Sequence, residues 1–362
     1  MASAEELYGI VERYAGFGLH HTGTEPDWAT ARWLVERLRA SGGEADIEPF
    51  DVDRYVVAAE LRSGAGEPIP SVPVFYSAVG HVETDDVTPM AIDGRIEGGA
   101  RGLDAHLDRL AGEGVAAAAL ALSGPTPHPI QCNRVPVVRS GPPAIIVAAD
   151  RLRDVPAATL TFTASTEPAT APNVVATVGP TSARPVTVTT PLSGWTPAAG
   201  ERGTGLAAAL ALTADLAADH QVRFVACSGH ELDHLGLERY LASRSVDADA
   251  VIHLGASVGA VEWVDGEGVL DRGRAVFATA DGETRADLAD LAAVGNWTLR
   301  TPDPWPGEGG TWRAAGARVL SFVGGSALFH TVGDVPEAAT TPEAMATAAE
   351  VVVRTTRRFL AS

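Results

Sequence analysis

The sequence predicts an α/β protein in which a mixed, mainly parallel sheet is sandwiched by helices and a small lobe is inserted. From Asn173 onward, short apolar runs alternate with helix-length segments, the pattern of a mostly parallel sheet covered on both faces. The region from about 63 to 154 has a different texture, rich in Gly and Pro. The composition, 46% hydrophobic and 20% charged over 362 residues, is that of a globular protein.

The N-terminal part predicts a helix followed by extended chain. Thr24–Asp27 resembles a capping box with a proline in the first turn, and apolar residues then recur at helical spacing: Ala31, Leu34, Val35 and Leu38. Gly42 and Gly43 end this helix, and residues 46–60 predict one or two strands.

The middle segment predicts a small α/β unit of its own. Its leucines Leu103, Leu107 and Leu110 mark a short helix, and two apolar strands are expected at Val115–Leu122 and Ala144–Ala148. We therefore expect residues 63–154 to form an inserted lobe, while residues 1–62 and 155–362 form the core.

The remaining chain alternates regularly. Strands are expected at Asn173–Val178, Pro185–Thr190, Val222–Cys227, Ala250–Gly255 and Arg318–Val323. Helices are expected at Gly205–Ala218, His234–Ser243, Thr284–Ala293 and Pro342–Leu360.

Charge and cysteine content narrow the class of protein. A net charge of −19 and a pI of about 4.9 argue against nucleic acid or an anionic membrane as the main partner. Cys132 and Cys227 are too few and too far apart for a disulfide framework. No apolar run approaches the ~18 residues of a membrane helix, and no signal-peptide pattern opens the chain, so the cytoplasm is the expected location.

Carboxylates and histidines follow several of the expected strands. Glu201, the pair His230-Glu231 and His330 lie in loops after three strands, and His253 lies within a fourth. In parallel sheets, ligands bind at the carboxyl ends of the strands. Imidazole and carboxylate groups converging from separate loops are what a zinc site requires.

Four segments, in this order, resemble the M28 family of zinc aminopeptidases over most of the chain. They are His21–Thr24 before a helix, the helix–strand turn Ala111–Val115 within an insert, Ala171–Ala176 with its Asn-Val pair, and Phe329–Asp334 with a central His-Thr. The resemblance implies the aminopeptidase fold, a protease-associated lobe and a two-zinc site that cleaves peptides.

This sequence departs from the family at one half of that site. The family's first ligand, a histidine, falls on Pro191, and its late aspartate falls on Gly255. Neither residue has a side chain that binds metal, so both private ligands of one zinc are lost. The family's aspartate two positions after that first ligand falls on Ser193.

The other half retains candidates for all three ligands. The resemblance places the bridging ligand on Glu201, the second carboxylate on Glu231 and the final histidine on His330. Glutaminyl cyclases share this fold and use one zinc held by Asp, Glu and His. We therefore expect one divalent metal ion, zinc, bound by Glu201, Glu231 and His330. His230 stands at the family's general base and would transfer protons.

The predicted function is that of a single-metal hydrolase or acyl-transfer enzyme acting on an amide of a small amino-acid-like or peptide substrate. The alternative is a non-catalytic member that binds a ligand or partner through the same cleft, and fold alone does not decide between them.

Several residues keep other interpretations open. One alternative for Glu201 is an ion pair with Arg202 or another arginine in place of a metal. For His230, the alternatives are a metal ligand or a structural polar residue. Residues 230–234 also spell His-Glu-x-x-His, the zincin signature, although a strand directly precedes it, whereas a zincin carries the motif within a helix. His20 and His21 are adjacent, so at most one faces the cleft. Ser193 has no assignable base.

Overall fold

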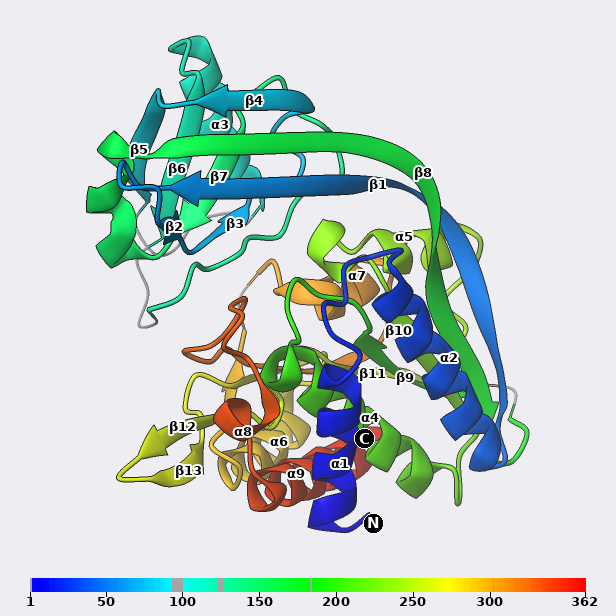
Figure 1. Ribbon diagram of the computed structural model, residues 1–362. Coiled ribbons are helices and arrows are strands. Elements are labelled where there is room, and N and C mark those ends of the chain that lie inside the picture. The colour runs from blue at the N-terminus through cyan, green and yellow to red at the C-terminus, as the bar shows by residue number, and fades with distance from the viewer. Residues whose placement is uncertain (1, 93–99, 123–126, 183, 302) are drawn as a thin grey trace.

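The computed structural model describes residues 2–92, 100–122, 127–182, 184–301 and 303–362. Two long strands, β1 (Glu44–Arg62) and β8 (Thr159–Val178), run from a larger core into a second lobe (Figure 1). They pair antiparallel along their whole length, from Glu44 opposite Thr177 to Arg62 opposite Thr159. The sequence pattern showed only the last residues of β8, because the rest is two-sided and partly exposed rather than uniformly apolar.

The core contains a mixed sheet whose central strands are parallel. Within the described part of the chain, the sheet has ten strands in the order β15-β14-β16-β11-β9-β10-β8-β1-β2, with β4 also paired to β8. The strands β16, β11, β9 and β10 are mutually parallel. Their bounds are Val319–Val323, Ala250–Leu254, Val186–Pro191 and Val222–Cys227. The expected fold class is confirmed.

Helices cover both faces of this sheet because the central strands are apolar on both sides. On one face, Val188, Phe224 and Ile252 pack against α2, α4, α6 and α9. On the other, Val225 and Val251 pack against α5 and α7. The bounds of these helices are Glu25–Ala40 (α2), Thr204–Leu216 (α4), Leu235–Ala242 (α5), Gly282–Ala293 (α6), Gly307–Ala314 (α7) and Pro342–Leu360 (α9).

The second lobe holds its own sheet and a short helix. Its strands run in the order β3-β7-β6-β5, and α3 (Ala100–Gly112) packs on them through leucines that include Leu103 and Leu107. The strands span Ser71–Pro73 (β3), Val87–Ile92 (β5), Ala117–Leu122 (β6) and Ala144–Val147 (β7). A 3₁₀ helix, η1 (Ala149–Ala157), leads into β8.

The two lobes share one hydrogen-bonded sheet. The short strands β2 (Pro68–Ile69) and β4 (Gly80–Thr84) pair with the far ends of β1 and β8. The far halves of these long strands therefore belong to the second lobe in space, although the domain boundaries expected from sequence assign them to the core.

Some elements gave no clear signal in the sequence. The N-terminal helix α1 (Ala4–Ala15) packs against α4 and α9 through Leu7, Ile10 and Val11. The hairpin β12 (Val261–Val264) and β13 (Glu267–Leu270), the edge strands β14 (Ala275–Ala278) and β15 (Thr298–Arg300), and the short helix α8 (Pro336–Ala339) complete the core.

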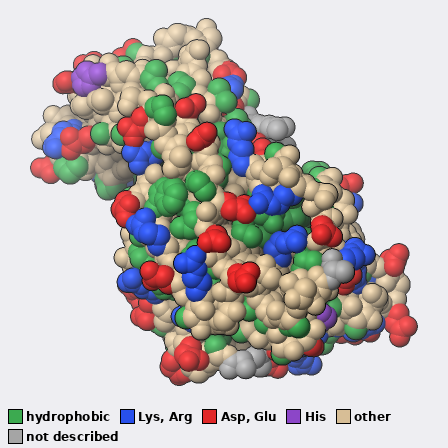
Figure 2. Space-filling model, turned by 90° about the vertical axis from the view of Figure 1, so that its right-hand side faces the viewer, with side chains coloured by type: hydrophobic (Ala, Val, Ile, Leu, Met, Phe, Trp, Pro, Cys, Tyr) green, Lys and Arg blue, Asp and Glu red, His purple; other side chains and the backbone are tan. Residues whose placement is uncertain are grey.

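The surface carries both signs of charge. On the face shown in Figure 2, acidic and basic side chains are interspersed rather than gathered into one patch of a single sign. None of the helices in the described part of the chain combines the length and the apolar character that crossing a bilayer needs.

Candidate functional site

The centre of the site is a buried ion pair between adjacent residues. Glu201 and Arg202 lie in η2 (Ala199–Gly203), one turn of π-helix that leads directly into α4. Their side chains are at most 1% exposed, and Arg202 Nη2 lies 2.7 Å from Glu201 Oε1. Arg202 Nε also donates to the backbone oxygen of Ser193 (3.0 Å).

His330 lies against the same carboxylate. Its Nε2 is 3.2 Å from Glu201 Oε1, and its Nδ1 is 2.9 Å from the backbone oxygen of Gln131 in the second lobe. Burial alone would raise the pKa of Glu201, but the charge of Arg202 and the contact with His330 lower it to about 2. Glu201 is therefore a carboxylate at neutral pH.

Asp334 fixes the turn that presents Glu201. Its carboxyl oxygens accept hydrogen bonds from the backbone N–H groups of Gly200 (2.7 Å) and Glu201 (2.9 Å). A Cβ at position 200 would lie 2.9 Å from Asp334 Oδ1, so this close approach requires the glycine. Asp334 thus positions the loop, and the structure shows a role for the last residue of the Phe329–Asp334 motif.

Glu231 is held apart from this pair. Its Oε1 accepts hydrogen bonds from both the backbone N–H (2.9 Å) and the hydroxyl (2.6 Å) of Thr22. Its Oε2 accepts from the hydroxyl of Ser193 (2.6 Å), which in turn accepts from the backbone N–H of Gly229 (2.7 Å). These hydrogen bonds stabilise the carboxylate of Glu231 without a metal.

The structure brings together two of the three expected metal ligands. Both carboxylate oxygens of Glu201 and Nε2 of His330 are buried without a well-aligned hydrogen bond. These atoms of Glu201 and His330 are therefore free to bind another group. A zinc site needs three or four protein ligands, and the described residues contain no group of three or more His, Cys, Asp or Glu placed to hold a metal ion. The guanidinium of Arg202 is the cation that this structure places beside Glu201. The three-ligand set Glu201, Glu231 and His330 remains a prediction, with only Glu201 and His330 brought together.

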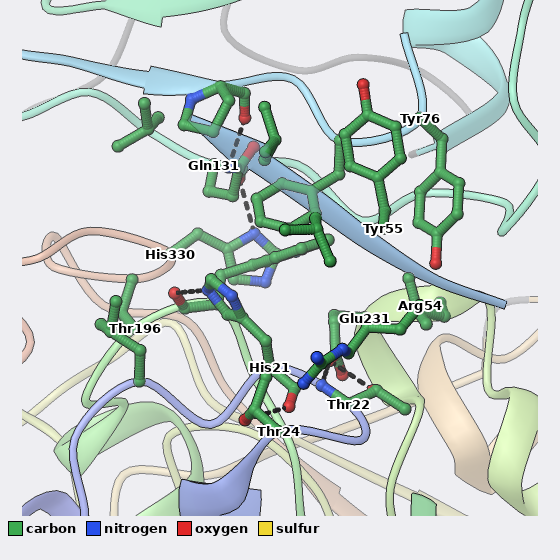
Figure 3. A pocket seen from close by; sticks show the side chains of 18 of the residues that line it. His21, Thr22, Thr24, Arg54, Tyr55, Tyr76, Gln131, Thr196, Glu231 and His330 are labelled. Atoms are coloured by element: carbon green, nitrogen blue, oxygen red, sulfur yellow. Dashed lines mark hydrogen bonds between the residues drawn. The ribbon is translucent and has the colours of Figure 1, made fainter. Parts of the chain in front are cut away.

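A cavity of about 440 Å³ opens beside Glu231 and His330, between the two lobes (Figure 3). Aromatic side chains form much of its wall, namely Tyr55, Phe75, Tyr76 and Trp195. The core contributes His21, Thr22 and Glu231, and the second lobe contributes Gln131. Trp195 Nε1 donates to Asn133 Oδ1 (3.2 Å), which ties this wall to the second lobe. An apolar wall with a few converging polar groups is typical of a small-molecule site.

His230 faces away from that cavity. It lines a second cavity, and its Nδ1 lies 3.0 Å from Oε1 of Glu308, a fully buried residue of α7. Burial, together with the charge of Arg202, lowers the pKa of His230 well below its usual value. The imidazole of His230 is therefore neutral, and it lines the second cavity and not the aromatic one.

The His-Glu-x-x-His segment is not helical. Residues His230–Leu232 form a single 3₁₀ turn, and Asp233 and His234 have positive φ values of 59° and 65° before α5 begins. The two histidine rings are 4.8 Å apart, but not on one helical face. The zincin interpretation is therefore excluded by the backbone.

Two further positions clarify the N-terminal loop. His21 lines the aromatic cavity and its Nε2 lies 2.8 Å from the backbone oxygen of Trp195, whereas His20 is buried and stacks on Tyr14.

Pro191 ends β9, and Gly255 follows β11, the strand beside it. Neither position offers a ligand.

Comparisons with solved structures identify the fold. BSAP, a zinc aminopeptidase from Bacillus subtilis, superposes with a TM-score of 0.73 at 17% identity, over 98% of this chain and 94% of that one. The Peptidase M28 precursor from Shewanella amazonensis SB2B gives 0.70 at 15% identity, over 98% and 95%. An aminopeptidase from Aneurinibacillus sp. strain AM-1 gives 0.65 at 16% identity, over 98% and 93%.

This chain has the fold of the M28 zinc aminopeptidases. The resemblance seen in its motifs is thereby confirmed at the level of the fold. No family model matches the sequence, and no curated protein matches it.

Sequence reasoning did not identify two residues of this site, Glu308 and Thr22. Glu308 lies on a helix rich in glycine with no apolar periodicity. Thr22 lies in the His21–Thr24 segment, in which nothing marks its hydroxyl as a partner of Glu231. Both are visible only once the chain has folded around Glu231 and His230.

Proposed function

We propose that this chain binds the free amino end of a peptide, or an amino-acid-like amide, in the aromatic cavity between its lobes. The observation that carries the proposal is the buried carboxylate of Glu231 at the edge of an aromatic wall. An ammonium group placed there gains a charged partner and the faces of aromatic rings.

Binding without metal-dependent cleavage is the function that the side chains support best. Glu231 is already satisfied by Thr22 and Ser193, and Arg202 supplies the positive charge beside Glu201. A divalent ion beside the buried guanidinium of Arg202 would be repelled by its positive charge. The nearby carboxylates do not offset this repulsion, because Glu201 already pairs with Arg202 and Glu231 already accepts hydrogen bonds.

Amide hydrolysis with one zinc is the second candidate. A structure of similar fold is named as a zinc aminopeptidase, which supports zinc-dependent hydrolysis but not the number of metal ions. If a zinc ion binds, Glu201 and His330 are the residues that would hold it, and it would polarise the amide carbonyl or activate a water molecule.

Isothermal titration calorimetry with leucinamide and N-acetyl-leucinamide tests the binding proposal. Leucinamide should bind at least tenfold more tightly, because a charged hydrogen bond contributes about 1.5–3 kcal/mol. Glu231→Gln should remove that difference, whereas the exposed Glu238→Gln on α5 should leave it unchanged. Equal affinities for the two amides in the wild-type protein would contradict the proposal.

Elemental analysis of protein purified without chelators separates the two candidates. The binding proposal expects far less than one zinc per chain and no release of leucine from leucinamide. About one zinc per chain, lost in His330→Ala together with hydrolysis, would establish the metal-dependent enzyme instead.

A further inference from the structure

The lining of the aromatic cavity carries one acidic side chain and one basic side chain. Among the described residues that line it, Glu231 is the one acidic residue and Arg54 is the one lysine or arginine. Glu231 comes from the core, in the turn after β10, whereas Arg54 lies near the middle of β1. The proposed ammonium site uses Glu231 alone, so the positive charge of Arg54 at the same cavity needs an explanation of its own.

The guanidinium of Arg54 lies beside the loop that holds Glu231. Its Nη1 is 3.4 Å from the backbone oxygen of Gly23. The preceding residue, Thr22, donates its backbone N–H and its hydroxyl to Glu231 Oε1. In Figure 3 the side chain of Arg54 extends toward Thr22 and Glu231. The two charged groups therefore contact neighbouring residues of one loop.

The protein partner of Arg54 is exposed and leaves the guanidinium with unused donors. Nε of Arg54 is 3.0 Å from Glu167 Oε1, and Nη2 contacts the same oxygen. The two side chains are 32% and 47% exposed, and ion pairs this open to water contribute little to stability. A guanidinium has five N–H groups. Glu167 and Gly23 engage three of them, which leaves two for a ligand.

A carboxylate is the group that such a guanidinium binds best, because its two oxygens match a pair of parallel N–H donors. The cavity then suits a ligand with an ammonium group at one end and a carboxylate at the other. Glu231 and Arg54 both contact the two-residue segment Thr22-Gly23. A dipeptide, which spans about 7 Å when extended, has a matching length, and a cavity of about 440 Å³ has room for it.

The cavity also has an apolar rim. Leu19, Val56 and Val332 line it and are 48%, 42% and 49% exposed. Val56 is two residues beyond Arg54 on β1. Large apolar side chains that gather half exposed at a cavity are typical of a surface that a ligand covers. The side chain next to the ligand's carboxylate is therefore expected to be apolar.

We propose that Arg54 binds the α-carboxylate of a dipeptide whose ammonium group is bound by Glu231, and that the apolar rim contacts its second side chain. This inference rests on the proposed ammonium site and narrows its ligand to dipeptides that are unblocked at both ends. Arg54 is then a specificity-determining residue that disfavours amidated and longer peptides.

Calorimetry at pH 7 with Leu-Leu and Leu-Leu-amide tests the role of Arg54. The wild-type protein should bind Leu-Leu at least tenfold more tightly, a difference of about 1.4 kcal/mol. Arg54→Gln should reduce this preference to less than about twofold, and Arg54→Lys should keep part of it, because lysine retains the charge but not the paired donors. If the protein cleaves these ligands, KM replaces the dissociation constant in each comparison.

The matched control is Arg62→Gln. Arg62 is an exposed arginine of the same strand that pairs with Glu60 and does not line the cavity. The tenfold preference for Leu-Leu should persist in this variant.

A second variant separates ligand binding from a structural ion pair. If Arg54 served only to pair with Glu167, Glu167→Gln would weaken Leu-Leu binding as much as Arg54→Gln does. Ligand binding predicts the opposite: Glu167→Gln should bind Leu-Leu as tightly as the wild-type protein or more tightly, because a competing carboxylate is gone. Leu-Gly, which lacks the second side chain, should bind at least about threefold more weakly than Leu-Leu.

Three results would each overturn the inference: equal affinities for Leu-Leu and its amide, equal losses in Glu167→Gln and Arg54→Gln, or equal affinities for Leu-Leu and Leu-Gly. A preference for leucinamide over N-acetyl-leucinamide in the same protein would then show that the ammonium site stands and that the role of Arg54 alone is wrong. Loss of that preference as well would overturn the proposed function with it.

Discussion

Replacing Arg202 by methionine should destabilise the protein by about 3–5 kcal/mol, the usual cost of removing one partner of a buried ion pair. The change leaves Glu201, which is 1% exposed, with only His330 beside its carboxylate. Methionine retains most of the volume of the arginine stem, so lost packing contributes little.

The structure gives an independent estimate of the magnitude. Burial raises the pKa of Glu201, yet Arg202 and His330 bring it from 4.5 down to about 2. At 1.36 kcal/mol per pKa unit, this difference corresponds to about 3 kcal/mol. Because the pKa is lowered in the folded state, this stabilisation is fully present above pH 4.5 and is lost as the pH falls toward 2. Arg202→Met should therefore abolish that part of the acid dependence.

Urea unfolding at pH 7, followed by circular dichroism, measures the effect. The double variant Glu201→Gln with Arg202→Met should be more stable than Arg202→Met alone, because no unpaired buried carboxylate remains. The exposed pair Arg32–Glu25 is the matched control, and Arg32→Met should cost less than about 1 kcal/mol. A loss below about 1 kcal/mol for Arg202→Met, or double-variant losses that simply add, would refute this account of the site.

Three further outcomes follow from particular residues. Between pH 6.5 and 8 the free energy of unfolding should fall by about 2 kcal/mol, because the folded state keeps a proton on Glu308, whose pKa is raised to about 8. Urea titrations across this range measure the fall, and Glu308→Gln should make it smaller. Gly236→Ala should destabilise the protein by at least about 1–3 kcal/mol or prevent folding, because a Cβ there would lie 2.0 Å from a backbone oxygen. Gly9→Ala is its control: a Cβ at Gly9 meets nothing within 4 Å, so the same unfolding assay should show no loss or a gain in stability. Neither Cys132 nor Cys227 should react with iodoacetamide at pH 8 in the folded protein, because burial raises the pKa of both thiols. Both should react in denaturant, and mass spectrometry detects the label. Alkylation of the native protein would contradict this expectation.

The buried polar residues around Glu231 line two different cavities. Glu231 and His330 line one cavity, His230 and His253 line the other. The charge of Arg202 lowers the pKa of both His230 and His253, although burial is the larger cause for each.

The sequence by itself determined the alternation of helices and strands in the C-terminal half and the order of the loops that carry Glu201, His230-Glu231 and His330. Val222–Cys227 and Pro342–Leu360 were predicted to the residue, because apolar periodicity follows directly from which face of an element is buried. That Pro191 and Gly255 have no side chain able to bind a metal follows from residue type alone.

Only the tertiary structure decided how the side chains are used. Glu231 turns to Thr22, a residue more than 200 positions away, and His230 turns to Glu308 on a helix that periodicity did not reveal. The sequence left open whether Glu201 would bind a metal or pair with Arg202, and the folded π-helical turn places that guanidinium 2.7 Å from the carboxylate. Local patterns predict helices and strands because the spacing of buried residues is a local property, whereas the partners of buried polar groups are set by contacts between segments that are distant in the chain.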